Sequence, residues 1–332
     1  MATIASAFQA AAGAFQLISE SSAGERARRA FTGALVLRVV EQALDGTAAF
    51  GFVAARAAAE IDSLPRGAER SILRRLLLMA EEGAECSLAL LLVDYAYELE
   101  TTRRLPEADA ALALARSVAA DNAEIALHAG RVARKLRDHN RALELYVCAR
   151  ELDAAGGTIS RLAAIGEAVV SPDPERALAR AIRGAVCAGD AEAAAVGLEE
   201  RARVRRSGGK RREAARDLCM AALRFQDPVD RARVAHELAD VAVVTGDTLA
   251  AREALLLAVS CGDAPQRDHA QSRLHTLSRD LGDEVGMRRW RSFKRPMLVS
   301  LSLSRTTAAP SSAALILARW REWIEMKASS EA

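Results

Sequence analysis

Two copies of one pattern follow each other in the chain, at Leu90–Asn122, LLLVDYAYELETTRRLPEADAALALARSVAADN, and Ile125–Ala154, IALHAGRVARKLRDHNRALELYVCARELDA. Matching side chains recur 34 residues apart: Ala96 and Gly130, Ala108 and Ala142, Leu112 and Tyr146, Ala115 and Ala149. A period of about 34 residues predicts a helix–turn–helix repeat. Two helices of about 14 residues cannot bury their apolar faces alone, so the copies must stack. Small side chains are then needed where the helix axes come closest.

These residues resemble the tetratricopeptide repeat (TPR) family. In that family the first helix carries a large residue, a large–small pair and another large residue, as Leu92, Tyr95–Ala96 and Leu99 do. The second helix carries a small, a large and a small residue, as the recurring positions of both copies do. The resemblance implies an all-α solenoid of stacked antiparallel helical hairpins. It also implies a concave face, lined mainly by the first helices, that binds a peptide or a protein.

The composition favours helix throughout. Of the 332 residues, 51% are hydrophobic but only 4% are aromatic, so alanine and leucine must supply the core. A net charge of +2 gives no bulk attraction to nucleic acid or to an anionic membrane. The five cysteines form no CxxC, which favours buried thiols in a reducing cytoplasm.

Residues 1–85 are expected to form diverged helical hairpins that cap the stack. Turn and capping residues divide this segment into four predicted helices, 3–19, 25–44, 47–61 and 67–82. The first of these has no basic n-region, so it is not interpreted as a signal peptide. No other uncharged run is long enough to span a membrane, and we expect none to do so.

Residues 86–295 are expected to carry the repeats. The spacing predicts later helices at 158–170, 176–188, 191–206 and 210–225, with a clear copy at 230–263. The small–large–small pattern returns there in two sets: Ala214, Leu218 and Ala221, then Ala251, Leu255 and Ala258. A last copy places Leu274 and Leu277 in one helix and Gly286, Trp290 and Phe293 in the next.

Residues 296–332 depart from the repeat. Residues 297–304 alternate apolar and polar side chains, which is typical of a strand, and residues 312–327 form an apolar helical stripe. We expect this tail either to cap the stack or to dock on a partner or a second copy, since bare tryptophans are costly in water. The residues expected to make that contact are Leu298, Leu301, Leu303, Trp320 and Trp323.

Motifs for catalysis and cofactors are absent from the sequence. There is no GxxxxGK[ST], GxGxxG, GxSxG or HExxH, and the five histidines lack metal-ligand spacing. Aspartate and glutamate alternate with arginine at helical spacing, which is typical of solvated helix faces. We therefore expect a non-catalytic protein without cofactor or metal.

The resemblance also implies where a ligand would bind. The family's contact positions follow the conserved residues of each first helix. Carried onto this sequence, they are Tyr97, Arg131, Arg134, Arg203, Arg206, His236, Asp240, Gln271 and His275. Arginine side chains there would suit carboxylates. The alternative is that these are ordinary solvent-facing residues.

One basic run, RARVRRSGGKRR at Arg201–Arg212, could contact phosphates. The favoured alternative is a solvated loop between two helices, since acidic residues flank the run and no aromatic residue is interleaved to stack on bases.

The function expected from the sequence is a non-catalytic adaptor or scaffold for a peptide or protein subunit. Two alternatives stay open: a regulatory sensor of a small peptide or effector, and a nucleic-acid binder that uses the basic run.

Overall fold

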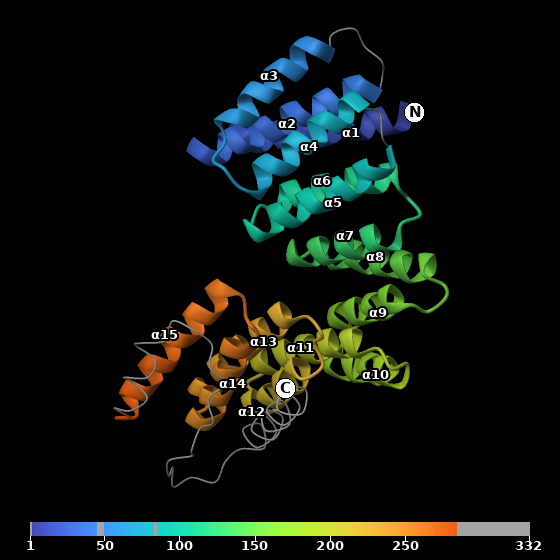
Figure 1. Cartoon of the computed structure of the whole chain (residues 1–332). Helices are drawn as coiled ribbons and strands as arrows, with labels where there is room; N and C mark the ends of the chain where they lie inside the picture. The colour runs from blue at the N-terminus through green and yellow to red at the C-terminus, as the bar shows by residue number, and fades with distance from the viewer. Residues whose placement is uncertain (1, 45–49, 83–84, 284–332) are drawn as a thin grey trace, which may run out of the picture. The chain divides into compact units, whose positions relative to one another are not determined.

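The computed structural model describes residues 2–44, 50–82 and 85–283 (Figure 1). Fifteen α-helices and no strand occur among these residues, which confirms the predicted all-α class for them. The predicted strand at 297–304 and helix at 312–327 lie outside the described residues, as do Leu298, Leu301, Leu303, Trp320, Trp323, Gly286, Trp290 and Phe293. Within residues 2–170 and within residues 171–283, consecutive helices pack on each other, which is compatible with a helical repeat.

The helices form two compact units, one ending at Val170 and the other beginning at Ser171. The first unit contains α1 (Ala2–Ser21), α2 (Gly24–Leu44), α3 (Phe50–Ser63), α4 (Ala68–Glu82), α5 (Glu85–Thr101), α6 (Leu105–Val118), α7 (Ala123–Lys135), α8 (His139–Leu152) and α9 (Thr158–Val170). Its N-terminal helices join the repeats directly, because α4 packs on α5 and α1 packs on α6. One apolar core therefore runs from Phe8 to Ala163.

The second unit contains α10 (Pro174–Cys187), α11 (Ala191–Ser207), α12 (Arg211–Ala222), α13 (Pro228–Val244), α14 (Thr248–Cys261) and α15 (Ala264–Asp280). Each helix packs on the next, and α13 and α15 also touch. The helix expected at 210–225 ends earlier, at Ala222. Phe225 lies beyond that end and is 1% exposed, with the Arg233 guanidinium 5.8 Å from its ring centre.

Two of the turns between paired helices share one chemistry. In α10–α11 and α13–α14, a glycine with positive φ, Gly189 (71°) or Gly246 (75°), ends the first helix. Only glycine adopts that conformation without a steric penalty. The next residue, Asp190 or Asp247, then accepts a hydrogen bond from the third backbone N–H beyond it and caps the following helix. These Gly-Asp pairs explain why the sequence predicts the boundaries well.

The recurring small residues lie in the core, as predicted. Ala108, Ala142 and Ala251 are completely buried, and so are Ala115 and Ala149. The large residues between them are 1–2% exposed: Leu112, Tyr146, Leu218 and Leu255. The positions that recur in the sequence are therefore buried positions of the core.

Two glycines leave room for one tyrosine. A Cβ atom on Gly130 of α7 would lie 2.7 Å from the ring of Tyr146 in α8, and one on Gly166 of α9 would lie 2.5 Å from it. Real Cβ atoms do not approach so closely, so the tyrosine fits between α7 and α9 only because both positions lack a side chain. This contact joins three consecutive helices.

Candidate functional site

Helix α5 exposes two large apolar side chains on one face. Leu90 and Tyr97 of α5 are each 56% exposed. They are seven residues apart, or about two helical turns, so they lie on the same side of the helix. Tyr97 is a position that the family resemblance implies, whereas Leu90 was missed; the seven-residue spacing to Tyr97 is the signal that finds it.

Ion pairs link α5 to α7. Glu100 of α5 accepts a hydrogen bond from Arg131 of α7 (Nη2–Oε2 3.3 Å) and another from Lys135. Burial alone would raise the pKa of Glu100, but Arg131 and Lys135 outweigh it and lower the pKa. Tyr97 lies one helical turn before Glu100, so the structure brings Tyr97 and Arg131 to the same surface. Arg134 follows one turn later and is half-buried.

His128 borders the same surface on α7, one turn before Arg131. Burial, and after it the charge of Arg131, lower the pKa of His128 to about 4. Its Nε2 atom lies 3.9 Å from Oε1 of Glu124. The imidazole is therefore neutral at physiological pH.

We name the surface made by Leu90, Tyr97, Glu100, Arg131 and Lys135 the α5–α7 face.

In the second unit, Arg203 of α11 lies in a dense network. Its guanidinium pairs with Glu199, with Glu200 (2.9 Å) and, across to α13, with Glu237 (3.5 Å). Arg233 of α13 also reaches Glu199 (Nη2–Oε2 3.0 Å) and Glu237 (3.6 Å). Arg203 is thus occupied by three carboxylates of its own chain.

His236 and Asp240 of α13 face α15. The Nε2 atom of His236 lies 3.2 Å from the backbone oxygen of Gln266, and its ring centre lies 5.0 Å from that of His269. Burial lowers the pKa of His236. The contact with Gln266 acts in the opposite direction, and the charges of His269 and Arg273 lower the pKa further. Asp240 pairs with Arg273 at 2.5 Å.

The two remaining predicted positions, Gln271 and His275, lie on α15 and are half-buried. Nε2 of His275 is buried and has no hydrogen-bond partner within the described ranges. The expected site residues therefore divide between the units, with Tyr97, Arg131 and Arg134 in the first and the others in the second.

The basic run is largely neutralised by its own chain. Arg201 and Arg205 both bind Asp217 of α12, at 2.7 and 2.9 Å. Arg205 and Lys210 bind Glu175 of α10, at 3.0 and 2.7 Å. Three arginines of the run stay exposed: Arg206, Arg211 and Arg212.

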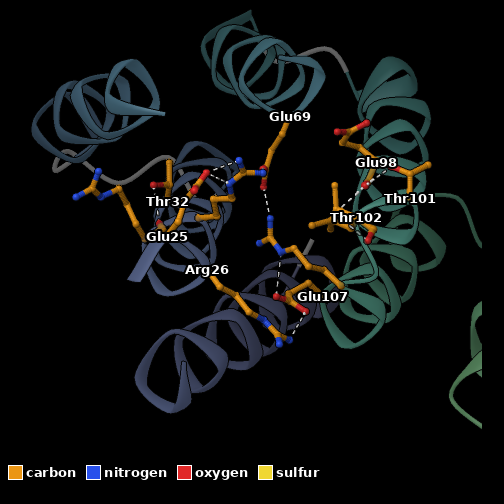
Figure 2. Close-up of polar contacts among 12 residues, drawn as sticks. Glu25, Arg26, Thr32, Glu69, Glu98, Thr101, Thr102 and Glu107 are labelled. Carbon is orange, nitrogen blue, oxygen red and sulfur yellow. Dashed lines mark hydrogen bonds and ion pairs between the residues drawn. The ribbon is translucent and has the colours of Figure 1, made fainter. Parts of the chain in front are cut away.

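A buried ionic cluster in the first unit was not predicted (Figure 2). Arg104, just before α6, bonds to Glu69 of α4 and to Glu107 of α6 (Nε–Oε1 3.1 Å). All three side chains are at most 8% exposed. Arg29 of α2 also reaches Glu69 (3.2 Å), and Arg26 approaches Glu107 (3.8 Å).

This cluster corrects the interpretation of the acidic residues as solvated helix faces. Buried carboxylates also occur at Glu199, Glu200, Asp217 and Glu253. One sequence signal could have found Glu107, because it lies four residues before Ala111 and seven before Leu114, on the buried stripe of its helix. Glu69 and Arg104 carry no such signal.

Tyr95 of α5 adds a buried hydroxyl near the cluster. Its ring stacks on Phe15 of α1 with 6.0 Å between ring centres, and its Oη lies 2.7 Å from the position of a Cβ on Gly33. Burial and then the charge of Glu69 raise the pKa of Tyr95. The group therefore stays protonated, and the cluster contains no activated nucleophile.

Other kinds of site have less support. No three histidine, cysteine, aspartate or glutamate side chains within residues 2–44, 50–82 and 85–283 are grouped to hold a metal ion. In those ranges no helix has both the length and the apolar character for a membrane crossing. Neither protein-family models nor curated proteins gave a match to this chain.

Proposed function

We propose that the chain is a TPR-like stack of antiparallel helical hairpins that acts as a non-catalytic adaptor. In this proposal the α5–α7 face binds a peptide or a protein subunit. The observation that carries it is the exposure of Leu90 and Tyr97, 56% each, on one side of α5. Large apolar side chains that cluster on a surface are typical of interaction sites.

The chemistry of the neighbouring residues supports a protein partner. Tyrosine and arginine are the residues that most often dominate protein interfaces. Arg131 and Lys135 are 37% and 42% exposed while bound to Glu100, so they can contact a partner without being released from α5. The face thus has an apolar centre with charged groups held at its edge.

The experiment is quantitative co-purification of the tagged full chain from its native cells. We compare wild type with a Leu90→Ser/Tyr97→Ser variant. The matched control is Leu143→Ser/Leu152→Ser, which removes two similarly exposed leucines (43% and 39%) from α8. Melting temperatures establish that all three proteins are folded.

We expect proteins enriched by wild type to fall at least about tenfold with the α5 variant, and to stay unchanged with the α8 control. The proposal fails if the α5 variant retains the same partners, or if wild type enriches nothing beyond a tag-only control.

A further inference from the structure

Helix α10 carries a row of unpaired arginines. Arg176, Arg180 and Arg183 are spaced by four and three residues, so they share one face of the helix. All three are exposed, and none of their side chains has a hydrogen bond or an ion pair with another residue in the described ranges. The sequence reasoning missed them because they are spread over two helical turns and form no continuous run.

Three more exposed arginines, Arg206, Arg211 and Arg212, flank the turn between α11 and α12. Glu175, in the first turn of α10, binds Arg205 and Lys210 and so holds α10 against that turn. Arg176 follows Glu175 directly, and Arg211 follows Lys210. We name the resulting surface the arginine face; it consists of Arg176, Arg180, Arg183, Arg206, Arg211 and Arg212.

The charge of this surface is not balanced locally. Between Ser171 and Phe225 only two carboxylates are exposed, Asp173 and Glu213. Asp173 already accepts a backbone hydrogen bond as the cap of α10. The other carboxylates of this segment are buried or half-buried, and three of them, Glu175, Glu199 and Asp217, hold the inner arginines and Lys210. The exposed arginines therefore remain available to an anionic partner.

We propose that the arginine face binds the phosphate backbone of double-stranded nucleic acid without reading its sequence. Arginine donates paired hydrogen bonds to phosphate oxygens, and phosphate contacts alone support binding that does not depend on sequence. Residues 171–224 contain no aromatic side chain to stack on unpaired bases, which favours a duplex over a single strand.

Two other anionic partners fit less well. A protein interface needs an apolar centre, but among residues 171–224 the only large apolar side chain that is exposed is Val186, at 49%. An anionic membrane would attract the charge, but the same lack of apolar side chains leaves nothing to insert.

The test is fluorescence anisotropy with the full-length chain and a labelled 30-base-pair duplex, in separate DNA and RNA forms. Salt is varied from 50 to 200 mM. The variant is Arg176→Gln/Arg180→Gln/Arg183→Gln. The matched control is Arg28→Gln/Arg66→Gln/Arg75→Gln, which removes the same charge from exposed arginines of the first unit. Circular dichroism melts establish that each protein folds, and vesicles with phosphatidylserine serve as a second anionic surface.

With six phosphate contacts, affinity should fall about a thousandfold between 50 and 200 mM salt. The α10 variant should roughly halve the slope of log affinity against log salt and bind at least about tenfold more weakly at 50 mM. The control should bind like wild type. If only the DNA duplex or only the RNA duplex binds, that nucleic acid is the one whose phosphates the face recognises.

Three results would overturn the proposal. The first is no retention of either duplex at 50 mM salt. The second is equal weakening by the α10 variant and the control. The third is binding to the vesicles without binding to either duplex.

Discussion

The two units use arginine–glutamate clusters in different ways. In the first unit, Arg104 and its partners Glu69 and Glu107 are at most 8% exposed. In the second, Arg203 and Arg233 are each 39% exposed, and both reach Glu199 and Glu237. Arg104 alone bonds to both carboxylates of the first cluster, whereas Glu199 and Glu237 of the second cluster each have two arginine partners. Removing an arginine should therefore cost more unfolding free energy in the first-unit cluster than in the second-unit cluster.

The difference follows from the helices that each cluster joins. The second-unit cluster links α11 to α13 by pairs separated by 34 residues, Glu199–Arg233 and Arg203–Glu237, so it follows the repeat. The first-unit cluster joins α4 to α6 by the pair Glu69–Arg104, which is 35 residues apart, and adds two arginines of α2. Both clusters therefore contain a pair close to the predicted period, and the first differs by the two arginines that α2 adds to it.

The largest expected effect is the loss of Arg104. Arg104→Met would leave two buried carboxylates with one weaker partner each, Arg29 for Glu69 and Arg26 for Glu107. Losing the buried cation that bonds to both should cost about 3 kcal/mol of unfolding free energy. Denaturant unfolding monitored by circular dichroism measures it.

Arg203→Met provides the contrast. Arg233 still reaches Glu199 and Glu237, though not Glu200, so the cost should be smaller than for Arg104→Met, at about 1 kcal/mol. Equal losses in the two variants would contradict the distinction between the clusters.

A smaller effect extends the comparison to pH. Because the pKa of His128 is about 4 in the folded chain and 6.5 in the unfolded chain, the unfolded state binds the proton first as pH falls. Stability is therefore lost between about pH 6.5 and 4, by about 2 kcal/mol at pH 5. Urea unfolding at pH 7.5 and pH 5 measures the loss.

In His128→Gln the part of this loss that belongs to His128 should disappear. Parallel losses in wild type and variant would show that other groups carry the pH dependence.

The packing of Tyr146 predicts an effect of about 1–3 kcal/mol. Gly166→Ala places a methyl group against the ring and should destabilise the first unit by that amount. Gly13→Ala is the matched control, since nothing lies within 4 Å of its Cβ position in α1. It should be neutral or stabilise by about 0.5–1 kcal/mol. Thermal melts distinguish them, and an unchanged Gly166→Ala melt would mean that α9 does not pack on Tyr146 as described.

The sequence predicted the helical spans because local chemistry determines them. The predicted helix 158–170 coincides with α9, and the N-terminal prediction of 3–19 compares with Ala2–Ser21 for α1. Apolar and small residues at a fixed period report burial directly, as Ala108 and Ala142 do.

Ion-pair partners could not be predicted in the same way. A carboxylate such as Glu69 looks the same in sequence whether it faces water or Arg104, because its environment depends on which distant helices meet. For the same reason Tyr97 was predicted as a contact residue, but its proximity to Arg131 through Glu100 was visible only in the structure. The six members of the arginine face became distinguishable from the other arginines only when the paired ones were known.

Site-specific photo-crosslinking tests the central proposal, a binding surface on α5 and α7, most directly. A photoreactive phenylalanine replaces Tyr97 on the α5–α7 face or, as a control, Leu143 on α8, in the full chain expressed in its native cells. The account predicts a covalent adduct with a protein partner from position 97 and none from position 143. An adduct from position 143 alone, or none from either position in folded protein at native abundance, would contradict it.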